Sequence, residues 1–312
     1  MSRAVRFDRY GGPDVLHVVD VDLPDPAAGE VRVTVRAAGL TAGGSAVREG
    51  ALAELYPTAF PSGEGAEFAG VVTAVGPGVE APAVGDEVLG WSGERSAQAE
   101  AVVVPAGQVV AKPAGISFAE AASLYVSGVA AYGCVEEVGA CDGATVVVTE
   151  AAGGVGAFVV QLARLCGGRV IGIAAPDRHG WLEAHGVLAV APAQDPVELV
   201  ARIRAVAGGA VHAFVDTAGE DYEAVARALG VAPTRATTTL GVEAATEFGA
   251  DPAPTGPGHR TTAPAVLTEL AQLVADGRLH VPIAGSYPLE QVQEAHAHLE
   301  RHPGTGKVVL LP

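Results

Sequence analysis

Basic residues are scarce in this sequence. Its 312 residues include 19 Lys and Arg against 36 Asp and Glu, which gives a formal net charge of −17 at pH 7 and a pI near 4.8. Because nucleic acids and membrane surfaces are polyanions, this balance argues against a nucleic-acid-binding protein and against a peripheral membrane protein. A small-molecule partner stays compatible with it, since net charge does not describe a local site.

Cysteine is scarce as well, and Cys134, Cys141 and Cys166 are the only three. Their number is odd, no two have CxxC spacing, and no Cys and His residues have the spacing of a zinc finger. We therefore expect free thiols in a reducing compartment, the cytoplasm.

Long apolar runs are also missing. Gly, Pro or charged residues interrupt every candidate run of about 18 residues, so we expect no membrane span, and the N-terminal sequence has no apolar signal-peptide core. Apolar residues still make up 49 % of the chain and charged residues 18 %, which is typical of a globular protein. At roughly 150 residues per domain, the length predicts about two domains.

Two patterns of secondary structure follow each other along the chain. Up to about residue 113, short β-branched runs separated by Gly and Pro turns predict a β-sandwich or a partly open barrel. From Ser117, which with Glu120 has the spacing of a capping box, helices alternate with apolar strands and predict a parallel sheet covered on both faces. Predicted strands occupy residues 144–149, 169–174, 212–216, 235–240 and 306–311, and predicted helices occupy residues 157–166 and 264–276. Residues 249–258 read as a surface loop, and the last strand as a return to the first domain.

The most informative motif is a glycine-rich turn at residues 151–156 (AAGGVG), which follows an apolar strand and leads into an amphipathic helix. In a dinucleotide-binding turn of this kind, Gly153 lets the backbone approach a pyrophosphate and Gly156 lets the helix pack closely on the strand. The free N–H groups and the dipole at the helix N-terminus favour phosphate binding. An ordinary tight turn is the alternative.

The end of the next strand indicates which dinucleotide would bind. An NAD site places a carboxylate there for the ribose 2′-hydroxyl, but Ala174 and Ala175 occupy these positions, and Arg178 follows Asp177. A guanidinium suits a 2′-phosphate, so we expect NADPH, with a solvated loop charge as the alternative for Arg178. The expected cofactor-binding residues lie at the ends of the strands: Ala152, Gly153, Gly154, Val155, Gly156, Ala174, Arg178, Thr217, Ala218 and Gly219.

An ordered set of short motifs carries a family resemblance. They lie at residues 11–16 (GGPDVL), 36–40 (RAAGL), 84–88 (VGDEV), 112–114 (KPA), 151–156, 216–219 (DTAG) and 306–310 (GKVVL). With these motifs the sequence resembles the zinc-independent medium-chain dehydrogenases/reductases, in the quinone oxidoreductase and enone reductase branch. The resemblance implies the α/β class: a GroES-like β-rich domain at residues 1–116 and 283–312, and a Rossmann domain with a doubly wound parallel sheet at residues 117–282. It also implies a homodimer, for which residues 235–240 offer a sheet edge.

The zinc branch of that superfamily carries a Cys and a His that this sequence replaces. Thr41 and Ala66 stand at the corresponding positions, so we expect no catalytic metal. The histidines His296, His298 and His302 do not share one helix face at a spacing of two residues, and we expect them to be solvated.

Without a metal, hydride from NADPH requires an acceptor that is already electrophilic, a quinone or an α,β-unsaturated carbonyl compound. A hydroxyl side chain or water would donate the proton. Relatives carry an Asn-Pro-x-Asp stretch where this chain has residues 41–46 (TAGGSA), and a Pro where it has Tyr125. The candidate catalytic residues carry hydroxyl groups: Thr41, Ser45, Tyr56 and Tyr125. A core aromatic for Tyr125, and a hydroxyl bonded to its own loop for Thr41, are the alternatives.

The sequence thus predicts a zinc-independent NADPH-dependent reductase of quinones or enones. An NADP(H)-binding pseudo-enzyme or sensor, motivated by the altered residues 41–46, stays open beside it. So does a specialised reductase of secondary metabolism on the same fold.

Overall fold

The computed structural model describes residues 1–54, 57–219, 222–239, 263–301 and 306–312. Contacts between Cα atoms divide the chain into two compact units, which we describe separately. The first unit comprises residues Met1–Val126 and Thr262–Pro312, and the second comprises Ser127–Thr261. The domain boundaries that the resemblance implies, at residues 116/117 and 282/283, stay a prediction.

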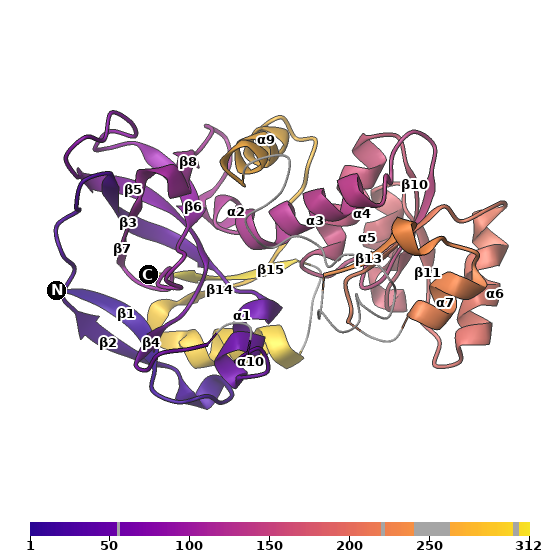
Figure 1. The fold of residues 1–312 in the computed structure, drawn as a ribbon, viewed down its shortest axis with the longest axis horizontal. Coiled ribbons are helices and arrows are strands. Elements are labelled where there is room, and N and C mark those ends of the chain that lie inside the picture. The colour runs from indigo at the N-terminus through magenta and orange to yellow at the C-terminus, as the bar shows by residue number, and fades with distance from the viewer. Residues whose placement is uncertain (55–56, 220–221, 240–262, 302–305) are drawn as a thin grey trace. The chain divides into compact units, whose positions relative to one another are not determined.

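Two β-sheets make up most of the first unit (Figure 1). In the smaller sheet β1 lies between β2 and β4, and in the larger one the order is β14-β15-β3-β5-β6-β8, with β7 also paired to β3. Side chains alternate between the two faces of a strand, and the buried residues Val31, Val33 and Val35 of β3 follow that period of two. The strands are β1 (Ser2–Phe7), β2 (His17–Val21), β3 (Glu30–Gly39), β4 (Ser62–Gly63), β5 (Glu67–Val75), β6 (Glu87–Trp91), β7 (Ala101–Pro105), β8 (Val109–Ala111), β14 (Ile283–Pro288) and β15 (Lys307–Leu311).

Strand β15 joins the end of the described chain to its beginning. It pairs in parallel with β14 and antiparallel with β3, where Val309 lies opposite Gly39. In Figure 1 the yellow C-terminal strands accordingly lie among the indigo and purple N-terminal ones. The prediction that the last strand returns to the first domain is confirmed.

Helices α1 (Ala42–Glu49), α2 (Phe118–Ala121), α9 (Ala263–Ala275) and α10 (Val292–Arg301) belong to the first unit. The predicted capping box of α2 is present, since the Ser117 hydroxyl accepts from the Glu120 N–H while the Glu120 carboxylate accepts from the Ser117 N–H. Helix α10 packs on β14 and β15 and also contacts α1. The segment that carries Thr41 and Ser45 is therefore packed against α10 through α1.

The second unit is built on a parallel sheet in the order β11-β10-β9-β12-β13. Its strands are β9 (Thr145–Val148), β10 (Arg169–Ile173), β11 (Leu188–Val190), β12 (Ala213–Asp216) and β13 (Ala236–Thr238). Its helices are α3 (Tyr125–Glu137), which begins in the first unit, α4 (Gly156–Leu165), α5 (His179–Ala184), α6 (Pro196–Ala207) and α7 (Glu223–Ala228). The predicted alternation of strand and helix is confirmed in every segment that the structure describes. The predicted loop at residues 249–258 lies outside the described residues.

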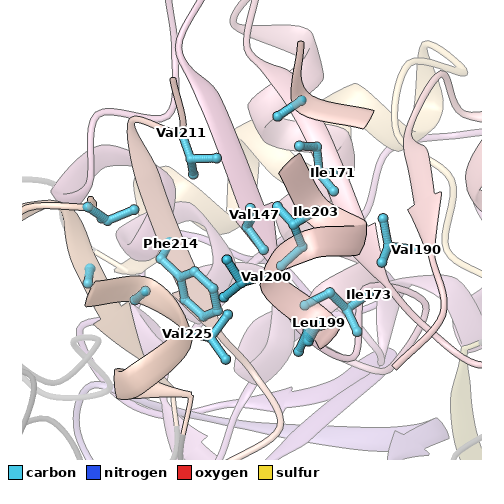
Figure 2. Packing of buried hydrophobic residues seen from close by; sticks show 14 residues of the cluster. Val147, Ile171, Ile173, Val190, Leu199, Val200, Ile203, Val211, Phe214 and Val225 are labelled. Carbon is cyan, nitrogen blue, oxygen red and sulfur yellow. The ribbon is translucent and has the colours of Figure 1, made fainter. Parts of the chain in front are cut away.

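Helices cover both faces of this sheet. On one face Val147, Ile171 and Phe214 pack against Leu199 of α6 and Val225 of α7, as Figure 2 shows. Gly172 lies between Ile171 and Ile173 and therefore faces the other side, where a Cβ would meet side chains of Ala151, Val187 and Leu182 of α5. Strands buried on both faces need the nearly continuous apolar sequences that β9 and β10 have.

The prediction of free thiols is wrong for two of the three cysteines. Cys141 and Cys166 form a disulfide, with their Cα atoms 5.0 Å apart and a sequence separation of 25, and Cys134 is a buried free thiol. The parallel fold brings the start of β9 and the end of α4 together, which the spacing of cysteines along the chain does not reveal.

No helix in the described residues has the length and apolar character that crossing a bilayer requires.

Candidate functional site

The sheet order of the second unit reverses direction beside β9. The chain runs from β9 to β10 on one side and later places β12 on the other, so β9 and β12 flank a topological switch point. In open α/β sheets, ligands bind at the carboxyl ends of the strands next to such a point. The expected cofactor-binding residues after β9, β10 and β12 gather at this edge of the sheet.

The glycine-rich turn has the geometry that its sequence predicts. A Cβ on Gly156 would lie 2.1 Å from the carbonyl oxygen of Glu150, which no side chain can accommodate, so glycine is required where α4 packs on the end of β9. A Cβ on Gly153 would lie 3.1 Å from the same oxygen. No side chain of the described residues caps α4 at Val155, although the Ala157 and Phe158 N–H groups donate to the carbonyl oxygens of Gly153 and Val155. The positive dipole end of the uncapped helix N-terminus favours an anionic ligand.

Asp216 fastens the loop of residues 217–219 to the end of β9. Its Oδ1 accepts hydrogen bonds from the Thr149 hydroxyl at 2.6 Å and from the N–H groups of Ala218 at 3.0 Å and Gly219 at 3.3 Å. Its Oδ2 accepts from the Thr238 hydroxyl at 3.2 Å. Burial raises the pKa of Asp216, while these donors act in the opposite direction. The carboxylate thus joins the ends of β9, β12 and β13.

Thr149 completes this network. Its hydroxyl oxygen accepts from the Thr217 N–H at 2.8 Å and the Ala218 N–H at 3.2 Å, and the Thr217 hydroxyl donates to the Thr149 carbonyl at 2.6 Å. Sequence reasoning named Thr217, Ala218 and Gly219 but missed Asp216 and Thr149 as the residues that position them. A polar residue at the carboxyl end of each of two apolar strands is the signal that would have found the pair.

Arg178, the residue predicted to bind the 2′-phosphate, lies in a short 3-10 helix, Pro176–Arg178, just after β10. Its side chain is 28 % exposed, and its Nε donates to the Asp177 carboxylate at 3.0 Å. The backbone here is fixed, because the Ala174 N–H donates to Val190 and the His179 ring lies 3.0 Å from the Ala174 carbonyl oxygen. The loop therefore presents a partly exposed guanidinium beside the predicted ribose position.

The candidate catalytic residues lie in the first unit. Thr41 is the N-cap of α1, and its hydroxyl accepts from the Gly44 N–H at 3.0 Å. Ser45, on the first turn, is 6 % exposed. Tyr56 lies outside the described residues. The structure thus brings Thr41 and Ser45 together at one helix N-terminus.

Tyr125 begins α3 in aromatic surroundings. Its ring stacks on Trp91 with centroids 4.6 Å apart and planes 3° from parallel. Burial raises the pKa of its phenol, and the negative charge of Glu67 adds to that shift. Glu67 is itself held by an ion pair with buried Lys307 at 2.9 Å and by the Val126 N–H at 2.8 Å, which fits a structural role for this acidic residue.

The expectation of solvated histidines on α10 is wrong for His296, which is 1 % exposed. Arg48 of α1 donates to its Nδ1 at 2.8 Å, so its Nε2 carries the proton and donates to the Gln98 side chain at 3.2 Å. Burial, then the charges of Arg48 and Arg95, lower the pKa of His296 to about 3. His298 is only partly exposed and contacts the Tyr287 hydroxyl at 2.9 Å. His302 lies outside the described residues.

Comparisons with known proteins agree with this architecture. A family model described as "Zinc-binding dehydrogenase" matches residues 135–310, more than half of the chain, and one described as "Alcohol dehydrogenase GroES-like domain" matches residues 27–114. The chain belongs to the medium-chain dehydrogenase/reductase family. The β-rich first unit and the parallel sheet of the second are the two folds that this family combines, so the predicted fold class is confirmed.

Individual members of the family are similar to this chain over most or all of its length. A quinone oxidoreductase of Pseudomonas aeruginosa is 30 % identical over an alignment of 332 positions, which covers 100 % of this chain and 100 % of that protein. The pikromycin polyketide synthase component PikAII of Streptomyces venezuelae is 34 % identical over 305 residues, which are 92 % of this chain and 8 % of that protein. Among solved structures, Escherichia coli quinone oxidoreductase complexed with NADPH is 27 % identical, with a TM-score of 0.84 over 99 % of this chain and 100 % of that one.

Proposed function

We propose that this protein is an NADPH-dependent oxidoreductase that reduces quinones or α,β-unsaturated carbonyl compounds. The observation that carries the proposal is the uncapped N-terminus of α4 behind a turn in which Gly156 is obligatory, at the switch point of a parallel sheet. The similarity to quinone oxidoreductases, one of them solved with NADPH, supports the same function.

Residues of the second unit fit the cofactor. The turn from Ala152 to Gly156 would hold the pyrophosphate, the loop of residues 217–219 would line the site, and Arg178 beside Ala174 would meet the 2′-phosphate. When bound, NADPH supplies the hydride. The chain's own contribution is to hold the dinucleotide by backbone N–H groups and to provide one placed cation in a chain of net charge −17.

We further propose that no zinc takes part, despite the description of the family model. Thr41 and Ala66 replace the thiolate and imidazole ligands, and a hydroxyl or methyl side chain is not a zinc ligand of that type. In the described residues no cluster of three or more His, Cys, Asp or Glu side chains is arranged to hold a metal ion. The acceptor must therefore be electrophilic before it binds, as quinones and enones are.

Hydroxyl groups of the first unit are proposed to face the substrate. Thr41 and Ser45 lie at the N-terminus of α1, where N–H groups and the helix dipole favour developing negative charge. Tyr125, whose phenol stays protonated at neutral pH, adds an aromatic surface together with Trp91. Tyr56 completes the predicted set.

A direct test mixes the protein with NADPH and a panel of quinones and enones and follows the loss of NADPH absorbance. We expect turnover with NADPH, and for Arg178→Ala a KM for NADPH higher by about 10-fold or more, with the KM for NADH nearly unchanged, because one charge-assisted contact is lost. Arg202→Ala, at a partly exposed arginine on α6, is the matched control. Binding of NADPH without turnover on the whole panel would favour the sensor alternative.

A specialised reductase of secondary metabolism is a second candidate. The similarity to a polyketide synthase component over 92 % of the chain favours it. Unsaturated thioesters belong to the same class of conjugated carbonyl acceptors, so including them in the panel separates the two. Preference for a thioester over every quinone by 100-fold in kcat/KM would support this candidate.

We also propose a cytoplasmic homodimer. Reduced nicotinamide cofactors are supplied by cytoplasmic metabolism, which supports the location. Within the described residues β13 pairs with β12 alone, and its other edge offers backbone groups to a second copy. Light scattering after size-exclusion chromatography, at about 62 kDa for a dimer of 31.2 kDa chains, tests the assembly.

A further inference from the structure

A polar cluster lies beside the first turn of α1, and we call Ser45, Glu64 and Arg95 the α1 cluster. Glu64 is 1 % exposed, whereas the Arg95 side chain is 24 % exposed. Arg95 Nη2 donates to Glu64 Oε1 at 2.8 Å and to the carbonyl oxygen of Gly44, next to Ser45, at 3.4 Å. The Gly65 N–H also donates to Glu64 Oε1, at 3.0 Å. The ion pair therefore lies against the segment that carries the candidate catalytic hydroxyls.

The α1 cluster is incomplete. Ser45 Oγ, Glu64 Oε2 and Arg95 Nε are buried atoms without a hydrogen-bond partner in the described part of the chain. Most buried polar atoms in native proteins are satisfied, and unsatisfied ones mark strain, a functional role, or a place for water or a ligand. Three of them in contacting or adjacent residues indicate a site that a further polar group completes.

A second arginine nearby shows what a purely structural role looks like. Arg48 is fully buried, and all three of its guanidinium nitrogens are bonded: Nε to Gly11, Nη1 to His296 and Nη2 to Glu300. Arg95 differs, because Nη2 alone of its guanidinium nitrogens donates within the described residues. Nη1 and the second N–H of Nη2 remain for a ligand, whereas Nε is buried.

Arg95 has an unusual backbone conformation. Its φ is +53°, in the left-handed region that residues with a Cβ rarely adopt. Strained positions persist where the surroundings over-determine them, and they cluster at functional sites. The adjacent first turn of α1 also leaves room, since a Cβ on Gly43 would meet no atom within 4 Å.

From these contacts we infer that Arg95 is a catalytic cation, which stabilises the oxyanion formed on the carbonyl oxygen of the substrate. The inference rests on the proposed function. As hydride adds to the conjugated carbon, the electron pair of the C=C bond shifts and leaves an enolate, or a hydroquinone anion, with its charge on oxygen. Arg95 donates hydrogen bonds to that oxygen, and a proton from water then completes the reduction.

Glu64 has a positioning role in this arrangement. Its Oε1 holds the guanidinium of Arg95 next to Gly44, and its burial keeps competing water away from the ion pair. Burial raises the pKa of Glu64, while Arg95, the Gly65 N–H and Arg48 act in the opposite direction. A carboxylate kept in such a costly position is explained if it orients a group that acts on the substrate.

The experiment compares Arg95→Gly, Glu64→Gln and the double variant with the wild type. Glycine accepts a positive φ, so Arg95→Gly relieves backbone strain, and in the double variant no buried charge loses its partner. We expect kcat/KM to fall by about 100-fold or more in both variants with Arg95→Gly, chiefly through kcat, and by less than about 10-fold in Glu64→Gln. The double variant should melt at or above the temperature of Glu64→Gln, and guanidinium ion at non-denaturing concentration should restore part of its kcat.

A second measurement needs no turnover. 4-Nitrophenol mimics the enolate, and its absorbance reports its ionisation; bound to the wild type it should ionise at lower pH than in solution, and this shift should vanish in Arg95→Gly. If 4-nitrophenolate does not bind the wild type, if the shift survives in Arg95→Gly, or if kcat/KM stays within threefold in that variant, the inference is overturned. A wild type that shifts the phenol but reduces no acceptor would instead refute the proposed function.

Discussion

Asp216 is a buried carboxylate that stabilises the fold by accepting hydrogen bonds, more than by its negative charge. Four donors converge on it, from Thr149, Thr238 and the loop of residues 217–219. Asp216→Ala leaves several of them buried without an acceptor, at about 1–3 kcal/mol each, whereas the amide of Asp216→Asn keeps one acceptor oxygen. We expect Asp216→Ala to lower the free energy of unfolding by about 3 kcal/mol or more and Asp216→Asn by less than half of that. Urea titrations measure both, and equal losses would contradict the network.

His296 makes the first unit sensitive to acid. Its folded pKa of about 3 lies below the unfolded value of 6.5, so between these values the unfolded chain binds the extra proton. The contribution of neutral His296 to the free energy of unfolding is fully present above pH 6.5. It is lost as the pH falls, by about 1.4 kcal/mol per pH unit, or about 2 kcal/mol between pH 6.5 and 5.

His296→Gln is the matched variant, because an amide can accept from Arg48 and donate to Gln98 without titrating. The slope of the free energy of unfolding against pH should be smaller by about 1.4 kcal/mol per pH unit in the variant than in the wild type. Parallel curves for the two proteins would show that His296 is not the titrating group.

At the scale of elements, the contact between the glycine turn and α4 is the most restrictive in the second unit. Gly156→Ala forces a Cβ against the Glu150 carbonyl oxygen, so α4 must move away from the end of β9. We expect a loss of about 2 kcal/mol in stability and at least a 10-fold weaker NADPH affinity, since the helix N-terminus shifts.

Gly180→Ala is the control for that substitution. Gly180 lies in α5, where a Cβ meets no atom within 4 Å, and alanine in a helix favours folding by about 0.5–1 kcal/mol. Calorimetry and fluorescence titration with NADPH compare the two variants. Similar NADPH affinities would mean that the position of α4 does not set the binding.

The elements themselves were largely predictable because their signals are local. The apolar run that becomes β9, the spacing of Ser117 and Glu120, and the glycines of the turn each act within a few residues. The partners of Arg48 were not predictable, since His296 and Glu300 lie about 250 residues away in sequence. The same holds for Glu64 and Arg95, whose pairing depends on how two loops meet.

Helix α10 shows where a local signal was available and overlooked. Val292, Ala295 and His296 are spaced by three and four residues and form one buried face. The periodicity places His296 toward the core. The expectation of solvated histidines rested on their spacing of two residues, which argues against a shared metal site but not against the burial of one of them. A buried histidine needs partners that hydrogen-bond both ring nitrogens, and Arg48 and Gln98 supply them.

At the scale of the whole molecule, the disulfide is the covalent constraint on the second unit. Closing a loop of about 25 residues removes entropy from the unfolded chain equivalent to about 3 kcal/mol. The double variant Cys141→Ser/Cys166→Ser should therefore unfold with a free energy lower by about that amount. Wild type kept in reductant is the control and should match the variant, while unchanged stability in both would mean that the two thiols are not joined in solution.

The pairing of β15 with β3 sets an order on how the molecule is made. Val309 lies opposite Gly39, so the large sheet of the first unit joins residues 270 positions apart. The second unit, in contrast, draws its sheet from one continuous stretch of chain. During synthesis the second unit has all of its strands while β3, which pairs with β5 and β7, still lacks β15 beside Ala38 and Gly39. That end of β3 stays open until the ribosome has released the residues that cover it.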